Sequence, residues 1–196
     1  YSRVRAASGM TGAEAARAML YSQGIRDVTI EPTHGFLSDH YDPRTNTLRL
    51  SPDVYGSTSL SAIGVACHEA GHALQHARGY APLSARSFMV PVASFGSWAA
   101  LPIIILGAMF SPPMISLGIA LYAALVLFQL ITLPVEFNAS SRAKEALANA
   151  GIIRGQAEAG GVSAVLNAAA LTFVAAAVSS IMTLLYFLMV FSGRRN

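Results

Sequence analysis

Long apolar runs in the second half of the chain predict three membrane-spanning helices. No charged side chain occurs in residues 88–110, 114–133 or 167–191. As a helix, each run is long enough to cross a hydrocarbon core of about 30 Å. Pro91 and Pro102 fall inside the first run and are expected to kink its helix.

The polar segments between the apolar runs predict how the spans are connected. Residues 111–113 leave room only for a tight turn, so the first two spans form a hairpin. The segments before residue 88 and after residue 133 must then lie on the same side of the membrane. Residues 142–160 are polar and partly helical in pattern, and Gly160 with Gly161 predicts a break before the third span.

The N-terminal part has shorter patterns that predict one helix and three strands. Residues 11–20 are rich in alanine, and Thr11 with Glu14 has the spacing of a capping box. Alternating or β-branched residues predict strands at 28–31, 36–41 and 47–50. The last two strands are joined by residues with turn chemistry and are therefore expected to form a hairpin.

Two histidines and a glutamate occur together in an otherwise apolar helical run at residues 59–75. His68 and His72 are four positions apart, so on a helix they share a face and can bind one metal ion. Glu69 is turned about 100° from His68 and lies beside these ligands. This H-E-x-x-H arrangement is typical of zinc proteases, in which the glutamate accepts a proton from the attacking water.

The composition supports a membrane protein. Hydrophobic residues make up 54% of the 196 residues, and charged residues make up only 12%. The mean hydropathy is +0.50. The net charge of +3 is small and is not gathered into a basic stripe, which argues against nucleic acid as a partner and suits contact with anionic lipid. The one cysteine, Cys67, excludes an internal disulfide framework and is expected to pack in the core.

A catalytic zinc ion usually has three protein ligands, so a third ligand is expected. A third histidine six residues after the second is excluded, because that position is Arg78. The remaining candidates are glutamates from the later part of the chain: Glu136, Glu145 and Glu158. Glu136 directly follows the second apolar run, where an acid without a partner is costly, and we favour it. The alternative is a glutamate solvated by lipid headgroups.

Three segments of the chain resemble the YugP-like neutral zinc metallopeptidases of bacterial membranes. They are Leu37–Pro43 (LSDHYDP), His68–Gln75 (HEAGHALQ) and Pro134–Ser140 (PVEFNAS). The resemblance covers nearly the whole chain. It implies a membrane-embedded zinc endopeptidase of the gluzincin type, with His68, His72 and Glu136 as Zn²⁺ ligands and Glu69 as general base. It also implies a further transmembrane helix at the start, which this sequence would lack.

This family is similar to the HtpX-type and CAAX-prenyl proteases, which carry Glu-Phe-x-Ala-Asp around the third ligand. Here Ser140 stands in place of that aspartate. Support of a metal ligand could instead come from Ser140, Asn138 or Arg142. An oxyanion donor is also required, and the candidates are His40, Tyr41 and Arg142.

The expected fold is mainly α and integral to the membrane, with a zincin-like catalytic helix, a small β-hairpin sheet and three transmembrane helices. Residues 1–87 would form the zinc-binding part, and 88–133 the transmembrane hairpin. Residues 134–166 would provide the third-ligand helix and a polar connection, and 167–196 the third span with a basic tail.

Protein or peptide substrates and membrane lipid are the expected partners, and a regulatory membrane partner or an oligomer is a further possibility. The alternative function is a non-catalytic membrane scaffold or partner-binding protein that retains a zinc site. A bacterial cell membrane with a cytoplasmic active site is expected under the positive-inside rule. On the catalytic side, the basic residues near the spans are Arg78, Arg86, Arg142, Lys144 and Arg154. On the other side they are Arg194 and Arg195.

Overall fold

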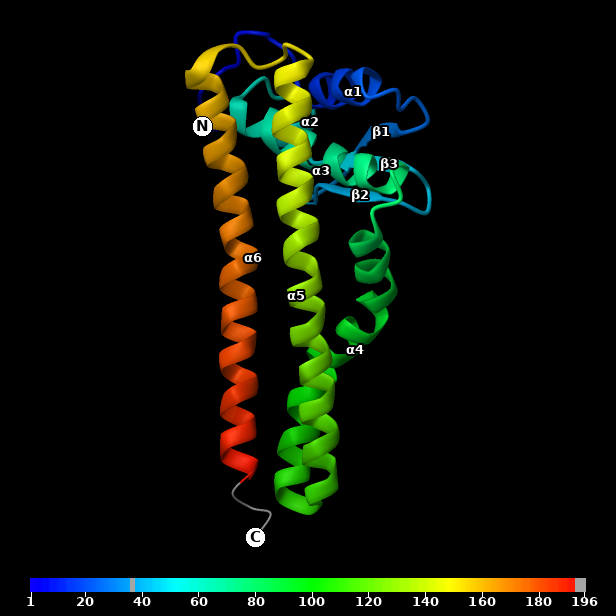
Figure 1. Ribbon diagram of the computed structural model, residues 1–196, viewed down its shortest axis with the longest axis vertical. Helices are drawn as coiled ribbons and strands as arrows, with labels where there is room; N and C mark the ends of the chain where they lie inside the picture. Colours follow the sequence, from blue (N-terminus) through cyan, green and yellow to red (C-terminus); the bar gives the residue numbers. More distant parts are fainter. Residues whose placement is uncertain (36–37, 193–196) are drawn as a thin grey trace. The chain divides into compact units, whose positions relative to one another are not determined.

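The computed structural model describes residues 1–35 and 38–192, and it is mostly helical with one three-stranded sheet (Figure 1). In chain order the elements are α1 (Gly12–Ser22), β1 (Thr29–Pro32), β2 (His40–Asp42), β3 (Thr47–Leu50), α2 (Pro52–Tyr55), α3 (Leu60–Ala77), α4 (Ala81–Phe110), α5 (Pro112–Asn149) and α6 (Gly155–Ser192). The chain forms two compact units. The first contains Tyr1–Tyr80 and Glu136–Ala170, and the second contains Ala81–Val135 and the described chain from Leu171 onward.

The capping box predicted for the first helix is confirmed. The Glu14 backbone N–H donates to Thr11 Oγ1 at 3.2 Å, and the Thr11 backbone N–H donates to Glu14 Oε2 at 2.9 Å. These bonds satisfy two N–H groups that the helix itself leaves unpaired. The helix then packs against α3 and buries Met19 completely. The start of α1 is thereby held against the helix that carries the histidines.

The sheet contains the predicted hairpin, with one strand shorter than expected. The strand order is β1-β3-β2, with β3 antiparallel to β2 and parallel to β1. The prediction of a strand from residue 36 is wrong for Ser38 and Asp39, while residues 36 and 37 lie outside the described part of the chain. The Asp39 carboxylate accepts bonds from Ser51 N (2.8 Å) and Ser51 Oγ (3.0 Å), which draws this segment toward the start of α2.

The predicted motif helix is confirmed as α3, in the centre of the first unit. Ser59 is its N-cap, because its hydroxyl accepts the Ala62 backbone N–H at 3.1 Å. The apolar face of α3 joins one core with α1, the sheet and the segments that follow Glu136. Cys67 lies in this core, and burial raises the pKa of its thiol. This cysteine therefore packs as an apolar residue, as expected.

The second apolar run does not end its helix at residue 133. The helix α5 begins at Pro112, with only Ser111 between it and the end of α4, and continues through Pro134 to Asn149. A proline forfeits one helical hydrogen bond, but the long run of helix-compatible residues on both sides carries the helix onward. Glu136 therefore lies within α5, the same helix that contains the second apolar run.

The break predicted at Gly160 and Gly161 is wrong. The chain turns instead at residues 150–154, and α6 runs through both glycines. Gly155, at the start of α6, has a φ of +74°, a conformation that glycine adopts without strain. A Cβ atom at Gly161 would lie 2.9 Å from Leu60 Cδ1. This glycine therefore lies inside α6 and lets Leu60 pack closely against the helix.

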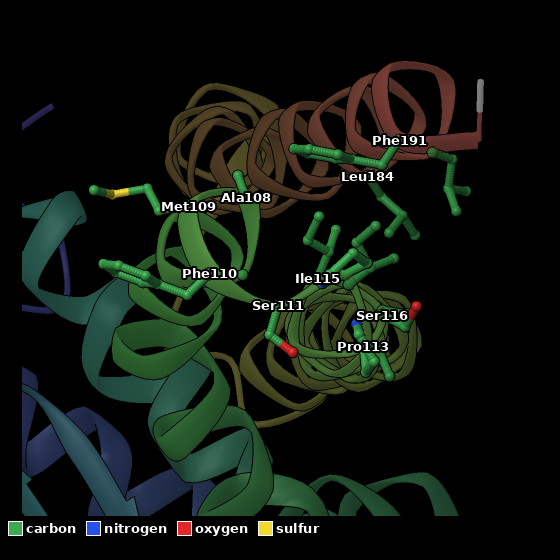
Figure 2. Close-up of a pocket in the computed structure, with 15 residues that line it drawn as sticks. Ala108, Met109, Phe110, Ser111, Pro113, Ile115, Ser116, Leu184 and Phe191 are labelled. Atoms are coloured by element: carbon green, nitrogen blue, oxygen red, sulfur yellow. The ribbon is translucent and has the colours of Figure 1, made fainter. Parts of the chain in front are cut away.

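The second unit contains the apolar parts of three helices that are long and apolar enough to cross a membrane. Within it, α4 and α5 approach closely, because a Cβ at Gly118 would lie 3.0 Å from the Ala100 carbonyl oxygen. A cavity of about 1080 Å³ lies among the end of α4, the start of α5 and the end of α6 (Figure 2). Its described lining contains no histidine, cysteine or acidic residue, so it is not the candidate active site.

Candidate active site

The helix α3 brings together three side chains that could hold or serve a metal ion. One ligand-capable atom from each of His68, Glu69 and His72 lies within 4.8 Å of the others. The side chains of the two histidines are 12% and 9% exposed, respectively. Polar groups this deep in an apolar fold require partners, and a cation shared by the three groups would supply one.

Glu136 reaches this cluster from α5, whereas the other candidate third ligands do not belong to it. Its Oε2 lies 3.0 Å from His68 Nε2 and 3.5 Å from His72 Nε2. Two ligands of a tetrahedral zinc ion lie about 3.3 Å apart when each is about 2.0–2.1 Å from the metal. The distances from the Glu136 oxygen to the two imidazole nitrogens therefore fit ligands of one Zn²⁺ ion.

The contact between α3 and α5 depends on the glycine inside the histidine motif. A Cβ atom at Gly71 would lie 2.5 Å from the Ala139 carbonyl oxygen and 3.2 Å from Ala139 Cα. Backbone atoms at that distance cannot give way without moving a helix. The absence of a side chain at Gly71 thus allows α5 to come close enough for Glu136 to reach the histidines.

Each histidine uses its second ring nitrogen to bind a polar side chain. His68 Nδ1 lies 3.1 Å from Ser140 Oγ. His72 Nδ1 lies 3.0 Å from Gln75 Oε1. Contacts of this kind orient metal-binding histidines and set which nitrogen faces the metal.

Gln75 was not singled out as a site residue from the sequence. Its side chain is completely buried, and its amide nitrogen donates to Asn138 Oδ1 at 3.0 Å. One feature of the sequence indicates a role for Gln75: it is a polar amide three positions after His72, on the same face of an otherwise apolar helix. The partner of this amide, Asn138, lies on α5 and is identified only by the tertiary structure.

The charges of the site favour a cation. Burial lowers the pKa of His72, but the hydrogen bond that its ring donates to Glu136 and the charges of Glu69 and Glu136 oppose burial and leave the pKa above its ordinary value. The same two carboxylates would attract a divalent metal ion. When such an ion binds, it replaces the proton that His72 otherwise holds.

The candidate oxyanion donors are already engaged elsewhere in the structure. His40 is exposed, and its Nδ1 lies 2.7 Å from the Ser38 carbonyl oxygen. Tyr41 donates its hydroxyl to Asn46 Oδ1 at 3.0 Å and also meets His76 Nδ1 at 2.8 Å. The pKa of Tyr41 is raised to about 12, mainly by burial, so its phenol stays protonated.

The remaining acids and Arg142 have other roles in the first unit. Arg142 donates from Nε to Asn138 Oδ1 at 2.7 Å. Glu158 accepts the backbone N–H groups of Ala7 (2.6 Å) and Arg154 (2.7 Å), close to the start of α6. Glu145 is exposed on α5. Among the three glutamates considered from the sequence, Glu136 is thus the one in contact with the histidines.

The fold and the site together define a class: a membrane protein with a His-Glu-His group that could hold a metal ion, beside a carboxylate from a second helix. Comparison with known proteins gives the same class. The chain belongs to the family described as "Putative neutral zinc metallopeptidase", which matches residues 1–192. The resemblance inferred from the three sequence segments is thereby confirmed.

One curated relative is "Putative membrane protease YugP" of Bacillus subtilis (strain 168). The two sequences are 53% identical over 198 residues, which cover 100% of this chain and 87% of that protein. No solved structure matches the chain. The family and this relative support a membrane protease that acts on proteins or peptides and uses zinc.

Proposed function

We propose that the chain is a zinc metalloendopeptidase of the gluzincin type, with His68, His72 and Glu136 as ligands and Glu69 as general base. The observation that carries this proposal is the convergence of both histidine Nε2 atoms on Glu136 Oε2, at 3.0 and 3.5 Å. Glu69 lies beside the ligands on the same helix. This proximity supports Glu69 as the base beside three zinc ligands.

The residues of the site divide the work of hydrolysis between them. Bound zinc would lower the pKa of the attacking water and polarise the scissile carbonyl group. Glu69 accepts the water proton and then delivers it to the leaving amine. His68, His72 and Glu136 hold the centre, while Ser140 and Gln75 orient the two imidazoles through Nδ1. His40, Tyr41 and Arg142 stay the proposed candidates for the oxyanion donor, and substrate would have to draw each of them from its present partner.

We infer that a substrate peptide binds as an added strand along β2. In the described sheet β2 pairs with β3 alone, so one edge of its backbone is available. This strand also lies against α3, which carries the catalytic glutamate. Main-chain hydrogen bonds along such an edge bind peptides with little dependence on side chains. Protein or peptide substrates with an extended, unfolded segment therefore suit this site.

A non-catalytic membrane scaffold with a retained zinc site is the alternative. Glu69 argues against it, because the two histidines and Glu136 already supply three ligands. A pure binding site has no need of an additional, partly buried acid beside them. Lipid surrounds the spans in either case, and a regulatory membrane partner or an oligomer is compatible with both functions.

Metal analysis tests the proposed function directly. The detergent-solubilised full chain, purified without chelators, is expected to contain about one zinc per chain and to cleave an unfolded protein. His68→Ala and His72→Ala are expected to remove the zinc and the activity together, because each deletes one of three ligands. Elemental analysis measures the metal, with Gln156→Ala as an exposed control. A wild-type protein that takes up no zinc would refute the proposal.

We also propose that the active site faces the cytoplasm. Basic residues near the spans are more numerous on the side of the catalytic part, and such residues favour the cytoplasmic side. The two opposing residues, Arg194 and Arg195, lie outside the described part of the chain.

Single cysteines in a Cys67→Ala background test this sidedness in intact cells. A thiol reagent that cannot cross the membrane is expected to label Arg195→Cys and to leave Arg44→Cys unlabelled. Both variants should react after the membrane is permeabilised, which controls for access to the thiol. Labelling of Arg44→Cys from outside, with Arg195→Cys protected, would place the active site on the outer face.

A further inference from the structure

We propose that Gln75, Asn138 and Arg142 form a directional hydrogen-bond chain that holds the proton of His72 on Nδ1. The chain runs from Arg142 Nε to Asn138 Oδ1 (2.7 Å), from Gln75 Nε2 to the same oxygen (3.0 Å), and from His72 Nδ1 to Gln75 Oε1 (3.0 Å). His72 then presents the lone pair of Nε2 to a metal ion. The proposal rests on the proposed zinc site and adds three positioning residues to it.

The direction of the chain follows from the chemistry of its first member. An arginine guanidinium has only donors and cannot accept a hydrogen bond. The atom of Asn138 that meets Arg142 must therefore be the amide oxygen and not the amide nitrogen. That same oxygen also meets Gln75, so the amide group of Gln75 must turn its NH₂ toward Asn138. The Gln75 oxygen is left facing His72, where only a protonated Nδ1 can donate to it.

Burial penalises the opposite arrangement. The Gln75 side chain is completely buried, so water cannot repair a mismatched amide. If this amide turned over, its oxygen would face the Asn138 oxygen, which already accepts from Arg142, and neither oxygen could donate. Arg142 is itself held in place, because its guanidinium lies 5.8 Å from the centre of the Tyr80 ring. The Arg142 end of the hydrogen-bond chain is thus restrained.

The other histidine lacks this restraint. Its Nδ1 meets the Ser140 hydroxyl, which can rotate to donate or to accept. The structure therefore assigns different roles to the two imidazoles. The hydrogen-bond chain that begins at Arg142 fixes one tautomer of His72. His68 can adopt either tautomer and keep its Nδ1 contact with Ser140.

Zinc affinity of the detergent-solubilised full chain, measured by competition with a chelator, tests the proposal. Gln75→Leu is expected to weaken zinc binding by about 10- to 100-fold, as for other groups that orient a metal-binding histidine. Asn138→Leu, at a half-buried position, should also weaken it, whereas Asn138→Asp should stay close to wild type because its oxygen accepts from both neighbours. Gln156→Leu on the exposed start of α6 is the matched control.

A second measurement needs no zinc. Nitrogen-15 NMR of labelled histidine is expected to show a proton on His72 Nδ1 in the wild type and in Asn138→Asp, with the signal assigned by its loss in His72→Ala. Equal zinc affinity of Gln75→Leu and wild type would overturn the proposal, as would Asn138→Asp binding as weakly as Asn138→Leu. If the wild type itself takes up no zinc, the proposed function fails. The hydrogen-bond chain is then judged by the Nδ1 proton, whose absence refutes it.

Discussion

Replacing Glu69 by glutamine is expected to lower peptide hydrolysis by at least about a hundredfold while zinc stays bound. General acid–base catalysis contributes roughly 10²- to 10⁴-fold, and an amide of the same shape cannot accept the water proton at neutral pH. The proposed ligands His68, His72 and Glu136 are untouched by this change. The measurement combines zinc content with initial rates of cleavage of an unfolded protein.

A matched acid on the surface controls for the loss of charge. Glu145→Gln removes a carboxylate from an exposed position on α5 and is expected to keep both zinc and activity. Full activity in Glu69→Gln would assign the general base to another group. Loss of zinc in Glu69→Gln would show instead that this carboxylate is needed to hold the metal, because its ligand atom lies within 4.8 Å of those of both histidines.

Glu136→Ala is expected to lose zinc and activity together, with no residual cleavage above background. The substitution removes the carboxylate oxygen that meets both imidazoles, at 3.0 and 3.5 Å, and leaves only two of the three proposed ligands. Two ligands from one helix do not enclose a catalytic zinc ion. Chelator competition measures the loss of affinity, and the same unfolded protein substrate reports the loss of activity.

The other two glutamates considered from the sequence are the controls for this substitution. Glu145→Ala should behave as wild type, because the side chain is exposed. Glu158→Ala should keep zinc but unfold more easily by about 1 kcal/mol, the usual cost of losing a helix cap. Its carboxylate accepts the backbone N–H groups of Ala7 and Arg154. A zinc-free Glu158→Ala beside a zinc-replete Glu136→Ala would overturn the choice of ligand.

Local patterns along the chain were sufficient to predict the main elements. The spacing of His68 and His72 specifies a shared helix face, since the helical period depends on the backbone alone. Uncharged runs specify the spans in the same way, because burying a charge in lipid is costly at any position along a helix. The capping box at Thr11 and Glu14 is likewise complete within four residues.

Features that depend on packing between distant segments were not predictable in this way. Gly160 and Gly161 predict a helix break from the sequence. In the structure Gly161 instead leaves space for Leu60, which is about a hundred positions away in the chain. The parallel pairing of β1 with β3 joins strands that are separated by β2, and no local turn signals it. In each case the deciding partner lies far along the sequence.

The sequence by itself determined the three apolar spans, the histidine motif and the preference for Glu136 as its partner, because each rests on residue type and short-range spacing. The tertiary structure alone decided how the site is completed. The close approach of α3 and α5 at Gly71 and Ala139 brings Glu136 to the histidines. The same approach joins Gln75 to Asn138, two amides whose roles appear only when both helices are present, because a hydrogen bond needs its donor and acceptor about 3 Å apart.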